Sequence, residues 1–253
     1  MSEVLTERRG NVLVITLNRP EAKNAINEAV AQQMVKVIDE LDADPELRVG
    51  VLTGAGGVFC AGMDLKGFLR GENPTVAGRG FGGLTQQPPQ TPLIAAVEGW
   101  ALAGGFELVL SCDLVVASRE AKFGIPEVKR SLVAGAGGLL RLQRRIPYHA
   151  AMELALTGEP IDAETAQRYG LVNRLTDPGG AVDAALELAE AICANGPLAV
   201  VATKRILRDS LFWGESESWS KQAEIMGPVF VSEDAREGAT AFAERRAPVW
   251  KGR

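Results

Sequence analysis

The sequence predicts an α/β fold in which strands and helices alternate through most of the chain and helices form its C-terminal third. Three observations support this class. The chain starts with a strand–strand–helix order, short apolar strands lead into glycine-rich segments, and apolar residues take helical spacing after Gly137. With 253 residues, 46% of them hydrophobic, the chain can bury a sizeable core in one large domain or in a domain with an extension.

The first expected elements are a hairpin and a helix. Strands over residues 4–8 and 12–18 flank a Gly-Asn turn. Apolar residues then recur at helical spacing over residues 30–41, which predicts a helix capped near Asn24 or Asn27.

The middle of the chain contains further short strands. They are expected at residues 50–53, 93–97 and 113–118, and a helix begins between the last two at Gly104 or Gly105.

Residues 71–87 differ from their surroundings. They are rich in glycine and proline, carry few aliphatic side chains and show no clear period. This composition indicates a mobile surface loop, which either covers a substrate as a lid or serves only as a connector.

The last third of the chain is helical. Helices are predicted at residues 181–194, 199–211, 217–231 and 233–245. Ser232 is the expected N-cap of the last one. The helices after Pro197 are too few to bury a core of their own. We therefore predict a core over residues 1–196 and a C-terminal helical region over residues 197–253, which packs on that core or on another subunit.

Charge and cysteine content limit the function classes. The formal net charge is −5, from 27 Lys and Arg against 32 Asp and Glu, whereas proteins that bind nucleic acid usually carry a basic excess. The cysteines Cys60, Cys112 and Cys193 are odd in number and far apart, so neither a disulfide framework nor a CxxC metal site is expected. Buried free thiols indicate a reducing compartment, and we expect a cytoplasmic protein.

Membrane insertion and histidine chemistry are also disfavoured. The N-terminus lacks a basic start followed by an apolar run, so no signal peptide is expected. The most apolar stretch is interrupted by Glu98, Glu107 and Asp113, which argues against a membrane span. The single histidine, His149, excludes multi-histidine metal sites, and no GxSxG motif accompanies it, so no metal site is expected.

Two glycine-rich segments carry candidate chemistry. They are GAGGVFCAGMDLKGF at residues 54–68 and EGWALAGGFELVLSCDLVVAS at residues 98–118. Each follows an apolar strand and could turn backbone N–H groups into a pocket, because glycine lets a ligand approach the main chain. A helix that begins at Gly104 or Gly105 would direct free N–H groups and its positive dipole end at a developing negative oxygen. Tight packing turns would have the same spacing.

Two glutamates are candidate acids. Glu107 lies within the apolar run from Phe106 to Leu110, where a carboxylate is rare unless it is paired or functional. The alternative is that Glu107 lies on the exposed stripe of an amphipathic helix. Glu127 follows Pro126 and would lie in the first turn of a helix, where acids are also common without any function.

Together these segments resemble the enoyl-CoA hydratase/isomerase (crotonase) superfamily. FCAGMDLK resembles its first oxyanion loop, and ALAGGFELVLSCDLVVAS resembles its second oxyanion loop with the following helix and strand. AKFGIPEVKRSLVAGAGGLLRL resembles the segment with a second glutamate, and LTGEPIDAETAQRYGLVNRL resembles a later helix, turn and strand. The similarity runs from about Val4 to Val249. It implies a crotonase-like spiral of stacked strand–strand–helix turns with a C-terminal helical trimerisation region, which builds a trimer or a dimer of trimers.

The resemblance also implies an acyl-CoA substrate, with coenzyme A as part of that substrate and no separate cofactor. The backbone N–H groups of Met63 and Gly104 would hold the thioester oxygen, and Glu107 and Glu127 fall where hydratases keep two catalytic glutamates. The expected reaction is reversible addition of water to a 2-enoyl-CoA. Glu107 would activate the water, while Glu127 would protonate the alpha carbon and act as the base in dehydration. Neighbouring carboxyls in an apolar pocket titrate together, so a bell-shaped pH–rate profile is expected.

Further positions are candidate contacts for the substrate by the same resemblance. They are Ala22, Lys23, Ala61, Asp64, Leu65 and Lys66. Lys66 could equally be a solvated lysine. A basic residue from the tail of a neighbouring subunit is another candidate, and the sequence does not choose among Arg245, Arg246 and Lys251.

Three residues depart from the common short-chain hydratase pattern. Met63 replaces a small residue, Ala103 a third glycine and Ile125 a glutamine. Met63 would reshape the acyl pocket, and Ile125 makes the surroundings of Glu127 more apolar. With AGGFE, these departures resemble the carnitinyl-CoA dehydratase-like branch and imply a functionalised or branched acyl-CoA. The alternatives are a double-bond isomerase, for which one acid would suffice, and a non-catalytic homologue that binds RNA or a protein partner.

Overall fold

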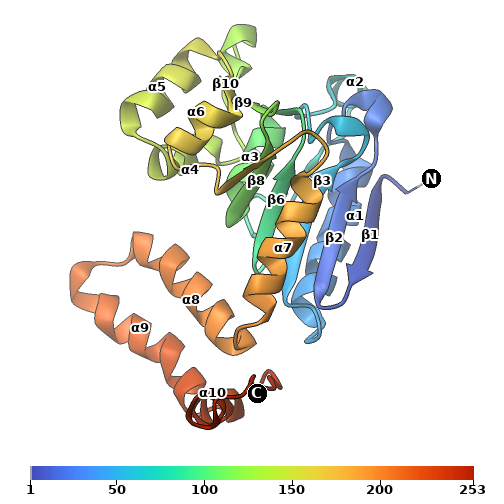
Figure 1. Ribbon diagram of the computed structural model, residues 1–253. Coiled ribbons are helices and arrows are strands. Elements are labelled where there is room, and N and C mark those ends of the chain that lie inside the picture. The colour runs from blue at the N-terminus through green and yellow to red at the C-terminus, as the bar shows by residue number, and fades with distance from the viewer. Residues whose placement is uncertain (1) are drawn as a thin grey trace.

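A six-stranded sheet forms the centre of the fold. The computed structural model describes residues 2–253, and its main sheet has the strand order β1-β2-β3-β6-β8-β11 (Figure 1). β1 and β2 pair antiparallel, and every later pair in this sheet is parallel. The strands are β1 (Val4–Arg9), β2 (Val12–Leu17), β3 (Val49–Gly54), β6 (Leu93–Val97), β8 (Leu114–Ser118) and β11 (Arg174–Thr176). The predicted hairpin and the predicted strands in the middle of the chain are confirmed.

Helices cover both faces of this sheet, and for this reason its inner strands consist almost entirely of apolar residues. α1 (Glu28–Ala43) packs on one face, where Leu52 of β3 joins its buried side chains. α7 (Ala181–Cys193) packs on the other face, against the neighbouring Val51. The cap of α1 is Asn27, whose side-chain oxygen accepts the Val30 N–H at 2.9 Å.

A second, three-stranded sheet carries the glycine-rich segments. β7 (Trp100–Leu102) pairs in parallel with β9 (Lys122–Gly124), and β10 (Ile161–Asp162) pairs antiparallel with β9. An isolated bridge between Cys60 and Ala101 joins the first glycine-rich segment to this sheet. From β6 to β9 successive strands therefore alternate between the two sheets, as in the stacked strand–strand–helix turns of the expected crotonase-like spiral.

Residues 71–87 do not form the surface loop that their composition indicates. They form a short hairpin of β4 (Thr75–Val76) and β5 (Gly80–Phe81). Residues 80–85 are buried. A Cβ at Gly83 would lie 2.5 Å from the Ala31 carbonyl oxygen, so glycine lets this segment lie directly on α1. The prediction of a mobile surface loop is therefore wrong for residues 80–85.

Shorter helices connect these elements. They are α2 (Leu65–Leu69), α3 (Gly104–Ser111), α4 (Gly138–Arg145), α5 (Tyr148–Thr157) and α6 (Ala163–Arg168), with the 3-10 turns η1 (Pro20–Ala22), η2 (Ala55–Gly57), η3 (Glu127–Arg130) and η4 (Ser210–Phe212). α3 begins at Gly104 as predicted, and α4 and α5 confirm the helical prediction after Gly137.

Three helices form a C-terminal arm that extends away from the sheets (Figure 1). They are α8 (Pro197–Asp209), α9 (Glu215–Phe230) and α10 (Glu233–Glu244). Ser232 caps α10 as predicted, because its hydroxyl oxygen accepts the Ala235 N–H at 3.0 Å. The Lys204 ammonium lies 2.6 Å from the Asp113 carboxylate and joins α8 to the main body.

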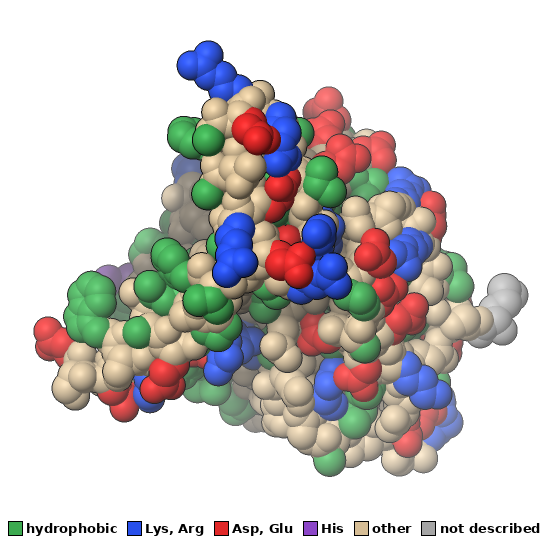
Figure 2. All heavy atoms as spheres, turned by 90° about the horizontal axis from the view of Figure 1, so that it is seen from below, with side chains coloured by type: hydrophobic (Ala, Val, Ile, Leu, Met, Phe, Trp, Pro, Cys, Tyr) green, Lys and Arg blue, Asp and Glu red, His purple; other side chains and the backbone are tan. Residues whose placement is uncertain are grey.

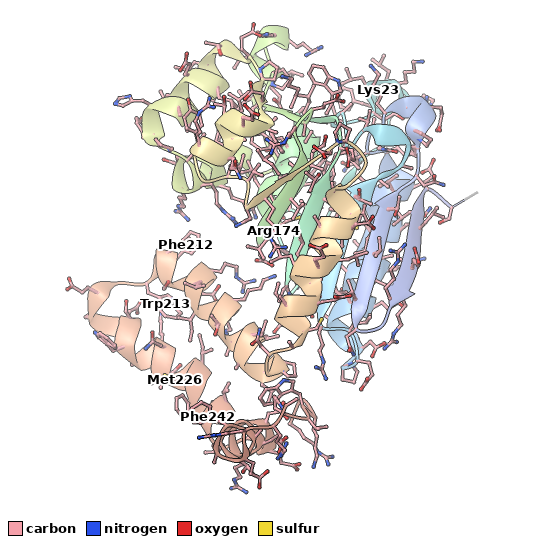
Figure 3. The ribbon with its side chains drawn as sticks, viewed as in Figure 1. Lys23, Arg174, Phe212, Trp213, Met226 and Phe242 are labelled. Atoms are coloured by element: carbon pink, nitrogen blue, oxygen red, sulfur yellow. The ribbon has the colours of Figure 1, made fainter. Side chains whose placement is uncertain are left out.

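Large apolar side chains of the C-terminal arm are exposed. Trp219 and Phe242 are 79% and 87% exposed. Figure 3 shows Phe242 with Phe212, Trp213 and Met226 along the arm, and Figure 2 shows hydrophobic side chains gathered on the projecting lobe at its left. Exposed apolar surface of this kind is typical of a surface that packs on another chain. Over residues 2–253, no single helix is long and apolar enough to cross a membrane; α7 passes that test only jointly with residues 197–212, across a bend of 108°.

Candidate active site

Some backbone N–H groups of the glycine-rich segments have no acceptor among the described residues, and two of them belong to Met63 and Gly104. Around Met63 the flanking groups are used instead: the Ile26 N–H donates to the Gly62 carbonyl at 2.8 Å, and the Asp64 N–H to the Ile26 carbonyl at 2.9 Å. Gly104 is the first residue of α3, where N–H groups have no acceptor within the helix. Both donors are therefore available to an oxygen atom of a ligand.

The two segments touch beside these donors. Gly62 has a φ of +101°, and a Cβ there would lie 2.8 Å from the Ala103 methyl carbon and 3.2 Å from the Gly104 nitrogen. Position 62 therefore requires glycine for both its conformation and its space. Ala103 has φ 51° and ψ −130°, a conformation that favours glycine. Ala103 therefore holds a backbone conformation that a glycine at this place would adopt with less strain.

Glu107 is buried in the first turn of α3, with 3% of its surface exposed. Its Oε1 accepts the N–H groups of Ala136 and Gly138, each at 2.8 Å. Burial raises the pKa of this carboxyl, and the two backbone bonds and the charge of Arg141 oppose that rise. An exposed helical stripe is therefore the wrong interpretation of Glu107. Since both N–H groups bind Oε1, Oε2 is available to a ligand.

Glu127 begins η3, a 3-10 turn rather than the expected helix, and is half-buried. Its Oε2 is buried and has no hydrogen-bond partner among the described residues. Burial raises the pKa of the Glu127 carboxyl, its own backbone N–H lowers it, and the negative charge of Glu107 raises it again. The structure thus brings the two glutamates close enough to influence each other. A buried oxygen without a donor is costly unless water or a ligand pairs with it.

An apolar groove of about 290 Å³ opens beside Glu127. Side chains of η3, α4, α5 and the segments on either side of η3 form its walls, and Ile125, Leu139 and Met152 are among them. The expected apolar effect of Ile125 on the surroundings of Glu127 therefore has a structural basis. A groove of this character suits an apolar chain next to a carboxyl group.

The other predicted contact residues lie in and around η1 and the first glycine-rich segment. The Ala61 N–H donates to the Lys23 carbonyl at 3.0 Å and brings Ala22 and Lys23 beside this segment. Lys23, Leu65 and Lys66 are exposed, and Figure 3 shows Lys23 at the end of the molecule away from the C-terminal arm. Their contact with coenzyme A stays a prediction. The carboxylate of Asp64 has partners within the protein: it caps α2 and lies 2.9 Å from the Arg19 guanidinium.

Several supporting residues were missed by sequence reasoning. Ala136 and Gly138 hold Glu107, and Arg141 lies near it. The only available signal was the run AGAGG before α4, since glycines there can bring backbone N–H groups close to an acceptor. Over residues 2–253, no group of three or more metal-binding side chains is present.

Comparisons with known proteins identify the family of this chain. The sequence model of the enoyl-CoA hydratase/isomerase family matches residues 7–253. An enoyl-CoA hydratase of Mycobacterium tuberculosis is 45% identical over 258 residues, which cover 99% of this chain and 97% of that protein. A carnitinyl-CoA dehydratase of Escherichia coli is 42% identical over 262 residues, with 100% of both chains covered. The crystal structure of an enoyl-CoA hydratase from Mycobacterium tuberculosis superposes with a TM-score of 0.99 at 61% identity, with 100% of both chains covered. The chain therefore belongs to the enoyl-CoA hydratase/isomerase (crotonase) superfamily.

Proposed function

We propose that this protein is an enoyl-CoA hydratase, which adds water reversibly to the double bond of a 2-enoyl-CoA. One observation carries the proposal: within residues 2–253, Glu107 and Glu127 each keep an oxygen atom available, and the N–H groups of Met63 and Gly104 have no acceptor. Family membership supports a lyase that acts on an acyl-CoA. Coenzyme A enters as part of the substrate, and we propose no separate cofactor.

The two N–H groups would stabilise the charge that develops on the thioester oxygen. When water adds to the beta carbon of a 2-enoyl thioester, negative charge moves to the carbonyl oxygen of the thioester. Backbone donors that are already in place need no rearrangement at this moment, and loss of one such donor costs about 3–4 kcal/mol of barrier. Met63 contributes only its backbone to this task, so its unusual side chain leaves the donor intact.

The glutamates would divide the two proton transfers. Two backbone N–H groups fix Oε1 of Glu107, and its Oε2 would orient the water and accept its proton. Glu127 would hold a proton, because burial and the charge of Glu107 raise the pKa of its carboxyl, and would deliver that proton to the alpha carbon. In dehydration both transfers run backwards, so Glu127 becomes the base.

The acyl group is the point on which a second candidate function depends. The groove beside Glu127 favours an apolar chain. The identity of 42% to a carnitinyl-CoA dehydratase, together with Ile125 in the groove wall, favours dehydration of a functionalised acyl-CoA as the second candidate. A double-bond isomerase or a non-catalytic binding homologue would leave Glu107 without a task.

We also propose that residues 197–253 join copies of this chain into a trimer or a dimer of trimers. The exposed Trp219 and Phe242 support this, because burial of apolar surface contributes about 25 cal/mol per Å². The mass in solution, measured by light scattering, should be three or six times the chain mass of 26.9 kDa. A monomer would contradict the proposal. Location in the cytoplasm stays a prediction.

The activity test follows the absorbance of the conjugated thioester of a short 2-enoyl-CoA. The wild type should consume it rapidly, and Glu107→Gln and Glu127→Gln should each lower kcat roughly 10²- to 10⁴-fold, as expected for a lost general acid or base. Glu120→Gln is the matched control, because Glu120 is an exposed acid between β8 and β9. Its rate should equal that of the wild type.

The outcomes separate the two candidates. Rapid turnover with unchanged rates in both glutamate variants would refute the two-glutamate mechanism. Binding of the enoyl-CoA without any turnover would refute the hydratase proposal and favour the second candidate. That candidate is then tested with carnitinyl-CoA and other substituted acyl-CoA esters, by the appearance of the same absorbance.

A further inference from the structure

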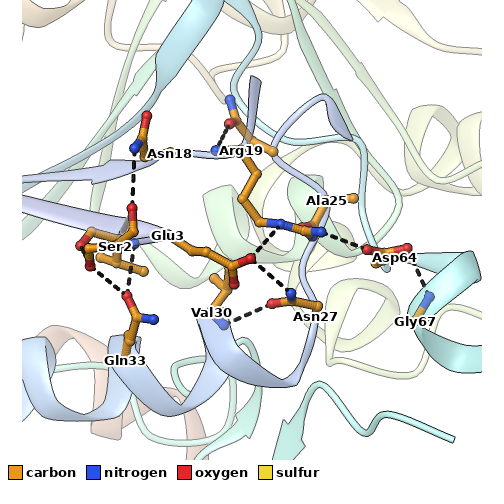
Figure 4. A network of polar contacts seen from close by, with 12 residues as sticks. Ser2, Glu3, Asn18, Arg19, Ala25, Asn27, Val30, Gln33, Asp64 and Gly67 are labelled. Carbon is orange, nitrogen blue, oxygen red and sulfur yellow. Dashed lines mark hydrogen bonds and ion pairs between the residues drawn. The ribbon is translucent and has the colours of Figure 1, made fainter. Parts of the chain in front are cut away.

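A chain of ion pairs ends at Asp64 in the segment FCAGMDLK, residues 59–66, which by resemblance is the first oxyanion loop (Figure 4). The Arg19 guanidinium lies 2.9 Å from Asp64 Oδ2 and 3.1 Å from Glu3 Oε1. The side chains of Arg19 and Asp64 are only 12% and 11% exposed, so water and salt screen this pair weakly. Arg19 thus links the start of β1 to the residue that directly follows Met63.

Asp64 divides its polar groups among four partners. Its N–H donates to the Ile26 carbonyl at 2.9 Å. Its Oδ1 accepts the N–H groups of Lys66 and Gly67, each at 3.0 Å, and so caps α2. Its Oδ2 binds Arg19. The guanidinium is therefore what holds the second oxygen of this carboxylate.

We propose that Arg19 is a positioning residue for the oxyanion hole, which fixes the direction of the Met63 N–H through Asp64. The inference rests on the proposed hydratase function and goes beyond it, because Arg19 would act on the loop through Asp64 and not by contact with the reacting atoms. The peptide unit that joins Met63 to Asp64 directly follows the unit that carries the Met63 N–H, so a movement of Asp64 is passed to that N–H across one residue. The bridge between Ile26 and Met63 holds the backbone of this loop, and the ion pair with Arg19 holds the side chain of Asp64.

A neutral side chain at position 19 would not replace the guanidinium. The carboxylates of Glu3 and Asp64 would both lose their cation, and Oε2 of Glu3 is already buried with no hydrogen-bond partner among residues 2–253. Removal of one partner from a shielded ion pair leaves an uncompensated charge. Asp64 would move toward water and carry the loop with it. A misplacement of about 1 Å can lower a rate about 10²-fold.

The kinetic test compares wild type, Arg19→Gln and Arg19→Lys with the enoyl-CoA ester that the wild type consumes fastest. Arg19→Gln should lower kcat roughly 10- to 100-fold and change KM less than about threefold, because oxyanion donors bind the transition state more strongly than the substrate. Arg19→Lys keeps the charge without the planar fork, and its kcat should lie between the other two.

Val12→Ala is the control for general loss of stability. Val12 is 3% exposed and packs in the cluster beneath α7, on the other side of the main sheet from α1. Its truncation should lower Tm and leave kcat unchanged. If Arg19→Gln lowers kcat no more than Val12→Ala does, the proposal is overturned.

Amide hydrogen exchange separates failure of this proposal from failure of the hydratase function, because it needs no substrate. Arg19→Gln should accelerate exchange of the Ala61 and Asp64 amides, whereas Val12→Ala should not. A wild type that converts no acyl-CoA refutes the hydratase function alone. Unchanged exchange over residues 60–67 in Arg19→Gln overturns the positioning role whether or not the wild type is active, and faster exchange with an unchanged kcat overturns it as well.

Discussion

Gly138→Ala tests whether the backbone cradle of Glu107 is needed for catalysis. Gly138 is buried at the start of α4, and its N–H donates to Glu107 Oε1 at 2.8 Å. A Cβ at this position would lie 2.8 Å from Glu107 Cγ and 2.9 Å from its Oε1. These separations are too short for atoms that are not bonded, so the methyl group would push the carboxylate away from the N–H groups that hold it.

The size of the effect follows from the hydrogen bonds at risk. A hydrogen bond to a charged group contributes about 1.5–3 kcal/mol. Loss of one of the two bonds to Oε1 should therefore lower kcat roughly 10- to 150-fold. These bonds also hold down the pKa of Glu107 against the effect of burial. Its pKa should rise further in the variant, and the acid limb of the pH–rate profile should move to higher pH.

Gly135→Ala is the matched control in the same loop. Gly135 is exposed, and a Cβ there would meet only the Val133 carbonyl oxygen, at 3.9 Å. Both variants are assayed by loss of the enoyl thioester absorbance across a range of pH, with the folded fraction measured by circular dichroism. Full activity of Gly138→Ala with an unmoved acid limb would refute the reasoning. Equal losses in the two variants would also contradict it.

Three further predictions concern other parts of the molecule. Glu127→Gln should raise Tm in mildly alkaline buffer. The Glu127 carboxyl, whose pKa is raised in the folded state, contributes fully to stability only below its unfolded pKa of about 4.3. That contribution is lost as pH rises through the folded pKa, whereas the amide of Gln has no such loss. The gain in Tm should shrink toward acid pH, and a gain that does not change with pH would contradict a raised pKa of Glu127 as its cause. Burial raises the pKa of the Cys60 thiol to about 12, so a disulfide reagent should label it only in denaturant; labelling of the folded protein, seen by peptide mass, would argue against this. The indole N–H of Trp250 donates to the Ala194 carbonyl at 2.8 Å. Trp250→Ala should release the C-terminal residues and speed their cleavage by carboxypeptidase, and an unchanged cleavage rate would count against that anchor.

The fold could be predicted where a signal repeats within one element. α1 and α7 carry apolar residues at helical spacing over several turns, and Asn27 and Ser232 are capping residues at the ends of such runs. The second sheet has no such signal, because β7, β9 and β10 are two or three residues long. It exists through pairing between distant segments, such as Trp100 with Lys122, which no local pattern records.

The candidate site likewise combines residues that a local signal marks with residues that only the fold brings to it. Glu107 stands out because it interrupts an apolar run, whereas its support at Gly138 lies 31 positions away and Arg19 lies 45 positions from Asp64. Neither Gly138 nor Arg19 belongs to a periodic pattern, and neither is unusual in its local sequence. Only the arrangement of the chain makes them partners of the site.

Glycine shows most directly what the sequence leaves undecided. Gly78 lies in the turn between β4 and β5, Gly83 follows β5, and both have positive φ, of +73° and +69°. A Cβ at Gly78 would meet nothing within 4 Å, whereas one at Gly83 would lie 2.5 Å from the Ala31 carbonyl oxygen. The first glycine therefore serves a turn in open space, and the second serves both a turn and close packing on α1. The two glycines lie in the same glycine-rich segment, so local composition could not distinguish them. The expectation of a surface loop is wrong at Gly83 because this residue packs on α1, which lies elsewhere in the sequence.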